Sequence, residues 1–230
     1  MELMPQRIEI FGDSILKGVI YQSETGKYRL FGGALERRMS DAGITLKRNC
    51  RMGSTIDGGL ERLSRRLQSE GDLAGAVVLL EFGGNDSDHD WKSVSVDPEG
   101  EHFPKLSIDR FASAYSEAVD MIRAHGGEAA VATLIPIDAE KYLDFISRGL
   151  SRENILRWLG DVSMLYRWHE EYNRTVEAIA ERKRCPVVDL RSTFLLSHRF
   201  SSLICDDGIH PTAAGHELIE DRLIGALAGA

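Results

Sequence analysis

Apolar residues along this chain follow two alternating patterns, one typical of buried strands and the other typical of amphipathic helices. Short runs that are apolar almost throughout predict parallel strands, because helices cover both faces of such a sheet. The predicted strands are Ile8–Phe11, Ile44–Asn49, Ala76–Phe82, Ala129–Ile135 and Pro186–Leu190.

Between the strands, apolar residues recur every three or four positions and predict helices with one buried face. The predicted helices are Leu30–Ala42, Ile56–Leu67, Ile108–His125, a helix-rich stretch from Ala139 to Lys183, and Pro211–Ala226 with its proline in the first turn. The irregular stretch Gly83–Ser107 is long for a compact domain and suggests a loop that faces a ligand.

Strands that alternate with helices are typical of a parallel sheet enclosed by helices. We therefore expect one α/β domain over residues 1–230, a flavodoxin-like three-layer α/β/α sandwich with a central five-stranded parallel sheet. A helical insertion is expected at about residues 137–172, where large apolar side chains gather. This insertion is either a helical pair packed on the core or a lid or dimer surface that shapes a pocket.

The bulk composition excludes several classes of protein. The chain carries 28 Lys and Arg against 36 Asp and Glu, a net charge of −8. Nucleic-acid binding is therefore not expected, because it needs clustered basic residues. No apolar run reaches the roughly 18 residues of a membrane-spanning helix, so we expect no membrane partner. Residues 1–5 are too few and too polar for a secretory signal.

The three cysteines, Cys50, Cys185 and Cys205, are widely spaced and form no CxxC pair. Neither a zinc site nor a disulfide framework is therefore predicted. This pattern fits a reducing compartment, the cytoplasm, although a secreted chain trimmed of its signal peptide would look the same. An oligomer stays possible.

Polar residues of the types used in catalysis follow four of the predicted strands, at residues 12–14, 49–54, 83–86 and 206–211. Ligands bind open α/β sheets at the carboxyl ends of the strands, so these segments should meet. They supply a serine, glycine N–H groups, an asparagine amide, an aspartate and a histidine. A hydroxyl needs a base, the base needs an orienting partner, and an oxyanion needs N–H donors. This set of groups is typical of acyl transfer.

Asp207 and His210 stand three residues apart, which lets the carboxylate reach the imidazole Nδ1–H. Nε2 of His210 is then left facing Ser14. The alternative interpretation is a turn whose acidic residues favour the N-terminus of the following helix. Asp13 is expected to brace the turn before Ser14 rather than to do chemistry.

Three of these segments resemble the sequence blocks of the SGNH (GDSL-type) hydrolases. Gly12-Asp13-Ser14 matches the first block, Gly83-Gly84-Asn85-Asp86 the third and Asp207-Gly208-Ile209-His210-Pro211 the last. The second block is looser, because Arg51 and Met52 precede Gly53 where small residues are common. The blocks occur in the family's order from residue 8 to the final helix, so the resemblance covers nearly the whole chain and implies the SGNH hydrolase fold.

The resemblance implies a role for each matched residue. Ser14 is implied as the nucleophile, His210 as its general base and Asp207 as the carboxylate that orients the base. The implied oxyanion donors are the backbone N–H groups of Ser14 and Gly53 and the side-chain amide of Asn85. An amide side chain suits that role, because it is a donor without acid–base ambiguity.

Three further residues in or near these blocks are expected to border the substrate pocket. They are Asp13, Arg51 and Trp91. The acidic run at residues 86–90 could instead ligate Mg²⁺ or Ca²⁺. Adjacent side chains point in different directions, however, so a solvated loop is the preferred interpretation. We expect no metal and no other cofactor.

The sequence thus predicts a serine esterase for a small-molecule ester, with a short-chain or O-acetyl acyl group as in a sugar deacetylase. One alternative is a lysophospholipase- or thioesterase-like acylhydrolase. Another is a carbohydrate- or ester-binding module of the same fold without turnover, which the intact Ser14, Asp207 and His210 argue against. A nucleotide-binding protein is disfavoured, because neither GxGxxG nor GxxxxGK[ST] is present.

Overall fold

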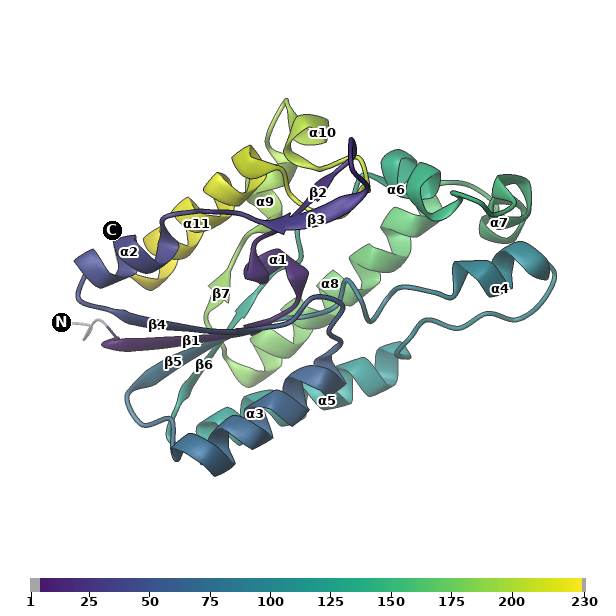
Figure 1. The fold of residues 1–230 in the computed structure, drawn as a ribbon. Coiled ribbons are helices and arrows are strands. Elements are labelled where there is room, and N and C mark those ends of the chain that lie inside the picture. The colour runs from purple at the N-terminus through teal and green to yellow at the C-terminus, as the bar shows by residue number, and fades with distance from the viewer. Residues whose placement is uncertain (1–4, 229–230) are drawn as a thin grey trace.

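The structure, a computed structural model, describes residues 5–228 of the chain. Its centre is a sheet of five parallel strands in the order β4-β1-β5-β6-β7 (Figure 1). The strands are β1 (Arg7–Gly12), β4 (Thr45–Cys50), β5 (Ala76–Glu81), β6 (Glu128–Ala132) and β7 (Val187–Val188). The predicted parallel sheet is therefore confirmed, although β7 has only two residues.

Helices cover both faces of this sheet, so the predicted three layers are confirmed. One face packs against α3 (Ile56–Glu70), α5 (Ile108–Ala124) and α8 (Ser163–Lys183). The other face packs against α2 (Leu35–Asp41), α9 (Arg191–Leu195) and α11 (Ala213–Leu227). The alternation of strand side chains explains this arrangement, because Val78 and Leu80 join the first core and Leu79 joins the second.

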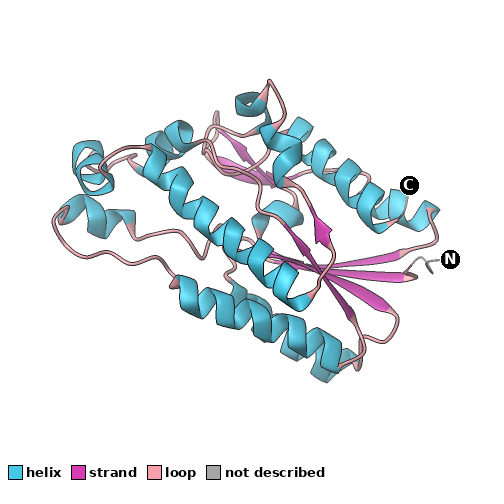
Figure 2. Cartoon of the chain, turned by 180° about the vertical axis from the view of Figure 1, so that it is seen from behind, coloured by secondary structure: helices cyan, strands magenta, loops and turns pink. Residues whose placement is uncertain are grey.

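Shorter elements gather at the carboxyl ends of the strands. They are α1 (Ser14–Lys17), the antiparallel hairpin β2 (Val19–Gln22) and β3 (Lys27–Leu30), α4 (Trp91–Val96), α6 (Ala139–Ile146), α7 (Arg152–Leu159) and α10 (Phe200–Leu203). Figure 2 shows α4, α6 and α7 at the end of the molecule that lies away from the N-terminus. A separate apolar cluster around Trp91, Tyr142 and Leu165 holds these helices together.

The structure differs from the sequence-based predictions at four places. Leu30 lies in β3 and Phe31 lies outside α2, so the helix predicted from Leu30 begins only at Leu35. The β2–β3 hairpin was missed, because its second strand is exposed and carries no clear apolar alternation. Gly26 has a φ of +64° in the turn between its strands, a conformation that glycine adopts without strain.

The other two differences concern the start of α11 and the presence of α4. Pro211 lies before α11 rather than in its first turn, and it forms an isolated bridge with Ile204. Thr212 is the N-cap, because its hydroxyl accepts the N–H of Gly215. The stretch predicted as irregular contains α4, which is short enough to escape a periodicity argument and is capped by Asp90. Between residues 5 and 228, no helix combines the length and apolar character needed to cross a membrane.

Candidate active site

The carboxyl ends of β1, β4 and β5 lie side by side and bring three of the predicted segments together. Gly12 pairs with Cys50 on one side and with Glu81 on the other, so the three strands end at the same level. A Cβ at Gly12 would lie 3.3 Å from both the carbonyl oxygen and Oε2 of Glu81. Glycine therefore lets β1 turn tightly against β5 immediately before the serine.

Ser14 begins α1 and is held by the residue before it. The Asp13 carboxylate caps this short helix, because its Oδ1 accepts the N–H of Ile15 at 2.8 Å. The Ser14 side chain lines a cavity, although the residue as a whole is only 5% exposed. The expectation that Asp13 braces this turn is confirmed.

Asp207 and His210 form a buried hydrogen-bonded pair at the site. Oδ2 of Asp207 lies 2.6 Å from Nδ1 of His210, and both residues are buried. Oδ1 of Asp207 also accepts the backbone N–H groups of Ile209 and His210. The carboxylate therefore receives the imidazole Nδ1–H and leaves the lone pair on Nε2.

Glycine is required between these two residues. Gly208 has a φ of +78°, and a Cβ there would lie 2.2 Å from the backbone nitrogen of Tyr142. The turn thus packs directly on α6, where Gly208 O accepts the N–H of Asp138 at 2.9 Å. The pairing of Asp207 with His210 is a property of a turn that only glycine permits.

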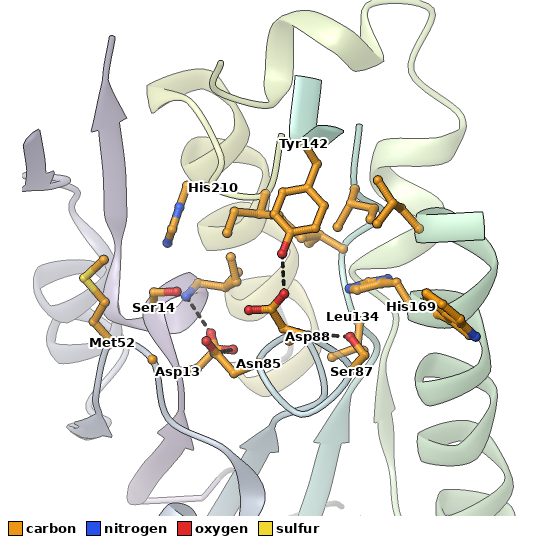
Figure 3. A pocket seen from close by; sticks show the side chains of 18 of the residues that line it. Asp13, Ser14, Met52, Asn85, Ser87, Asp88, Leu134, Tyr142, His169 and His210 are labelled. Atoms are coloured by element: carbon orange, nitrogen blue, oxygen red, sulfur yellow. Dashed lines mark hydrogen bonds between the residues drawn. The ribbon is translucent and has the colours of Figure 1, made fainter. Parts of the chain in front are cut away.

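Nε2 of His210 is buried and has no hydrogen-bond partner among residues 5–228. Figure 3 shows this nitrogen pointing toward the Ser14 side chain across the top of the pocket. The Tyr28 ring, from the β2–β3 hairpin, packs edge-on against the imidazole with 5.2 Å between ring centroids. Catalytic hydrogen bonds commonly tighten only when substrate binds, so the open Nε2 fits a base in the free protein.

The predicted oxyanion donors line the same cavity as Ser14. Nδ2 of Asn85 donates to Oδ2 of Asp13 at 2.8 Å, which fixes the orientation of the amide. Because Nδ2 carries two hydrogens, a second N–H stays available to a ligand. Gly53 has a φ of +73° with open space where a Cβ would be, so glycine serves the backbone conformation here.

Buried carboxyl groups surround the turn that carries the serine. Burial raises the pKa of Asp13 and raises that of Glu81 well above its ordinary value. Burial also raises the pKa of Asp86 to about 7, although the N–H of Ile56 opposes this shift. Oδ1 of Asp86 accepts that N–H at 2.9 Å and so stabilises the start of α3.

The cavity has a volume of about 230 Å³, and its opposite wall is largely apolar. That wall comes from the segment after β6 and from α4, α6 and α8. Its residues are Trp91, Leu134, Ile135, Ile137, Tyr142, Leu165, Trp168 and His169. Asp88 ties these helices together, because it accepts the Tyr142 hydroxyl at 2.5 Å and the Trp91 Nε1–H at 2.8 Å.

All but two of the predicted site residues line this cavity. Asp13 and Trp91 line it, as expected for the pocket. Arg51 does not line it: the residue is exposed, and its neighbour Met52 borders the cavity instead. Residues 51–54 form a tight turn, closed by the Ser54 N–H and the Arg51 carbonyl oxygen, so Arg51 and Met52 point in different directions. Asp207 is buried directly behind His210.

The metal interpretation of residues 86–90 finds no support in the geometry. Asp86 holds α3, Asp88 holds Tyr142 and Trp91, and Asp90 accepts two backbone N–H groups of α4. Within the part of the chain that the structure describes, no three His, Cys, Asp or Glu residues converge to hold a metal ion.

Two pocket residues, His89 and His169, are not among the site residues predicted from the sequence. Both are buried and line the cavity. The available signal for His169 was its place on α8, where it follows Leu165 by four residues on the inward stripe of an amphipathic helix. Nothing in the sequence around His89 distinguishes it from a loop residue.

Comparison with known families agrees with this arrangement. Residues 10–218 match the model of the GDSL-like lipase/acylhydrolase family. This match spans most of the chain, so the protein belongs to that family, as the sequence blocks predict. No curated protein sequence matches the chain.

Solved structures with the same fold include several enzymes of this kind. A lipase/acylhydrolase from Enterococcus faecalis shares 17% identity, with 97% of this chain and 95% of that chain covered and a TM-score of 0.66. A lipolytic protein of the G-D-S-L family from Veillonella parvula shares 15% identity, with 97% and 99% covered and a TM-score of 0.67. An acetyl-xylooligosaccharide esterase from Geobacillus, solved as a mutant, shares 17% identity, with 99% and 96% covered and a TM-score of 0.64. These likenesses confirm the fold.

Proposed function

We propose that this protein is a serine esterase that hydrolyses short-chain carboxylic esters, O-acetyl esters included, with Ser14 as its nucleophile. The observation that carries the proposal is the buried Asp207–His210 pair, whose 2.6 Å contact leaves Nε2 of His210 open on the side of Ser14. A carboxylate, an imidazole and a hydroxyl in this sequence are the parts of a general-base-activated nucleophile.

In the proposed reaction, Oγ of Ser14 attacks the ester carbonyl carbon while Nε2 of His210 takes the hydroxyl proton. The bond to the alcohol oxygen then breaks, and His210 returns the proton to that oxygen. Water next attacks the acyl-Ser14 carbonyl with His210 again as the base, which releases the carboxylic acid and restores the serine. Asp207 stays ionised throughout and stabilises the imidazolium.

The oxyanion that forms in each step needs preorganised donors. The amide of Asn85 suits this role, because Asp13 fixes one of its N–H bonds and leaves the other free. The backbone N–H groups of Ser14 and Gly53 are the two further donors in the proposal. All three residues line the cavity that holds the serine.

The cavity supports a short acyl group. Its volume of about 230 Å³ is smaller than the roughly 300–1,000 Å³ of sites that enclose drug-sized ligands. One structural neighbour is named as an acetyl-xylooligosaccharide esterase, which favours O-acetyl groups on sugars as a substrate class. A lysophospholipase- or thioesterase-like acylhydrolase would need room for a longer chain.

The test is hydrolysis of p-nitrophenyl acetate, butyrate and octanoate by the wild type and by Ser14→Ala. We expect turnover of acetate and butyrate, weak turnover of octanoate, and loss of about 10⁵–10⁶-fold in kcat for Ser14→Ala. Ser40→Ala, on the exposed surface of α2, is the matched control and should behave like the wild type. A fluorophosphonate should label the wild type at Ser14.

Faster turnover of octanoate than of acetate would replace the short-chain proposal with a long-chain acylhydrolase. Absence of both turnover and labelling in the folded wild type would leave the binding module as the better interpretation.

A further inference from the structure

His169 reaches the cavity from α8 without a hydrogen-bond partner to explain its burial. The residue is only 7% exposed, and its Nδ1 is buried with no partner among residues 5–228. Its Nε2 lies 4.0 Å from the position that a Cβ would take at Gly84, next to Asn85. Figure 3 shows the imidazole on the opposite side of the pocket from Ser14 and His210.

Another buried histidine shows what a structural role looks like in this fold. His216 is equally buried, but its Nε2 lies 2.9 Å from the carbonyl oxygen of Val19. A buried polar group that lacks such a partner is unfavourable and needs an explanation. His169 differs from His216 in one further respect: it lines a cavity that is open to a ligand.

The charge of this wall restricts the kind of group it can bind. Burial lowers the pKa of His169 to about 3 and that of His89 to about 4, so both are neutral at ordinary pH. A neutral imidazole offers one donor and one acceptor, which a hydroxyl or carbonyl group complements. The Asp88 carboxylate lines the same cavity and disfavours an anion. The Arg191 guanidinium disfavours a cation, because it lies close enough to depress the pKa of His169.

The position of His169 assigns the polar group to one half of the ester. His210 must protonate the departing alcohol, so the alcohol lies beside His210. The acyl group then extends toward the other wall, where Leu134 and His169 lie (Figure 3). Leu165 and Trp168 line the cavity from the same helix as His169. An acyl chain made only of hydrocarbon would satisfy those apolar neighbours but leave the imidazole unpartnered.

Resting on the proposed esterase function, we infer that His169 forms a specificity subsite for a neutral hydroxyl or carbonyl group on a short acyl chain. The rest of the wall accommodates the methylene groups of that chain. His169 is a binding residue for the substrate and takes no part in bond making or breaking.

The experiment compares esters that differ only by a hydroxyl and a methyl group. The probes are p-nitrophenyl 3-hydroxybutyrate against 3-methylbutyrate, and 5-hydroxyhexanoate against 5-methylhexanoate, each corrected for its rate of alkaline hydrolysis. For at least one pair we expect the wild type to favour the hydroxylated ester about 3- to 10-fold in kcat/KM, the scale of one neutral hydrogen bond.

The variants His169→Phe and His169→Gln separate binding from folding. The preference should fall to about 1 in His169→Phe and survive in part in His169→Gln, which keeps a donor and an acceptor. His198→Phe, on the exposed surface, is the control and should keep the wild-type preference. Circular dichroism and fluorophosphonate labelling establish that each variant is folded with a reactive serine.

Two results would overturn the inference. Equal rates within both pairs for the wild type, or an unchanged preference in folded His169→Phe, would remove the subsite while leaving the esterase intact. If the wild type neither hydrolyses any of the four esters nor reacts with the fluorophosphonate, the proposed function fails, and the subsite fails with it.

Discussion

The two walls of the pocket are built by different means. One wall holds the residues proposed for catalysis, Ser14, Gly53, Asn85 and His210. This catalytic wall consists of turns at strand ends, with directed hydrogen bonds such as Asn85 to Asp13 and His210 to Asp207. The helical wall, Trp91, Tyr142, Leu165, Trp168 and His169, is held mainly by packing. A catalytic reaction requires reacting groups in a fixed orientation, which hydrogen bonds provide. Selectivity among acyl groups instead depends on the shape of the pocket.

Aromatic contacts illustrate the second kind of construction. The His89 and Trp168 rings stack with 4.6 Å between centroids and 29° between planes. Trp91 meets Tyr142 edge-on, with 6.2 Å between centroids. Such contacts fix the outline of a surface but leave few polar atoms on it. His89 and His169 are exceptions, because each has a buried Nδ1 without a partner among residues 5–228. The inferred subsite is placed at His169, whose Nε2 lies close to Gly84 beside Asn85.

The comparison also holds for charge. The catalytic wall is backed by carboxyl groups whose pKa is raised, namely those of Asp13, Glu81 and Asp86. The helical side carries imidazoles whose pKa is lowered, namely those of His89 and His169. Burial is the first cause in each case, and it favours the neutral form on both sides of the pocket.

The largest expected loss of activity concerns Asp207, which orients the proposed general base His210. Asp207→Asn should lower kcat by about 10⁴-fold, because an amide at that position favours the wrong tautomer of His210. Steady-state kinetics on p-nitrophenyl acetate measure this loss. Asp206→Asn, at the exposed neighbouring position, is the control and should stay near the wild type. A near-normal rate for Asp207→Asn would reduce the triad to a Ser14–His210 dyad.

A smaller effect is expected for one donor of the catalytic wall. Asn85→Ala should lower kcat by about 10²–10³-fold, the scale of a single lost oxyanion donor, with a much smaller change in KM. Asn154→Ala is a matched control, because that amide donates to the Ser95 carbonyl in the helical region instead. If Asn85→Ala raised KM and left kcat unchanged, Asn85 would bind substrate without stabilising the oxyanion.

The smallest effect expected is on the pH dependence of stability, and it has opposite signs for the two walls. His169 has a lowered pKa of about 3, so the stability it contributes is lost as the pH falls from about 6.5 toward 3. Asp86 has a raised pKa of about 7, so its contribution is lost as the pH rises from about 4 toward 7. Thermal unfolding between pH 5 and pH 7 measures both.

Substituting each residue should change the pH dependence of the unfolding temperature, in opposite directions for His169 and Asp86. Measured relative to the wild type, the unfolding temperature of His169→Phe should be higher at pH 5 than at pH 7. That of Asp86→Asn should be higher at pH 7 than at pH 5. Each difference should be on the order of 5 °C. His198→Phe should leave the pH dependence unchanged. Parallel curves for all these proteins would show that neither group is buried in its neutral form.

The sequence predicted the catalytic wall far better than the helical wall. Ser14, Asn85, Asp207 and His210 were predicted from short blocks at strand ends, and the structure places all four at one edge of the sheet, three lining the cavity and Asp207 behind His210. Arg51 was misplaced, because it lies in a tight turn over residues 51–54 whose adjacent side chains point in different directions.

His89, His169 and Tyr28 were missed for a different reason. His169 lies on a long helix whose inward stripe reads as core. Tyr28 lies on an exposed strand that meets His210 only through the fold of the hairpin. Residue type and spacing do not distinguish an inward-facing residue that lines a cavity from one that packs in the core.

The sequence by itself determined the parallel sheet, the order of its helices and the residues at the strand ends, because apolar periodicity and glycine turns are local properties. Tertiary structure alone decided which helices face the serine, which buried acids and histidines have shifted pKa values, and which buried polar groups lack a partner. Those outcomes depend on desolvation and packing between segments far apart in the chain, such as α8 against the end of β5, and no local pattern encodes them.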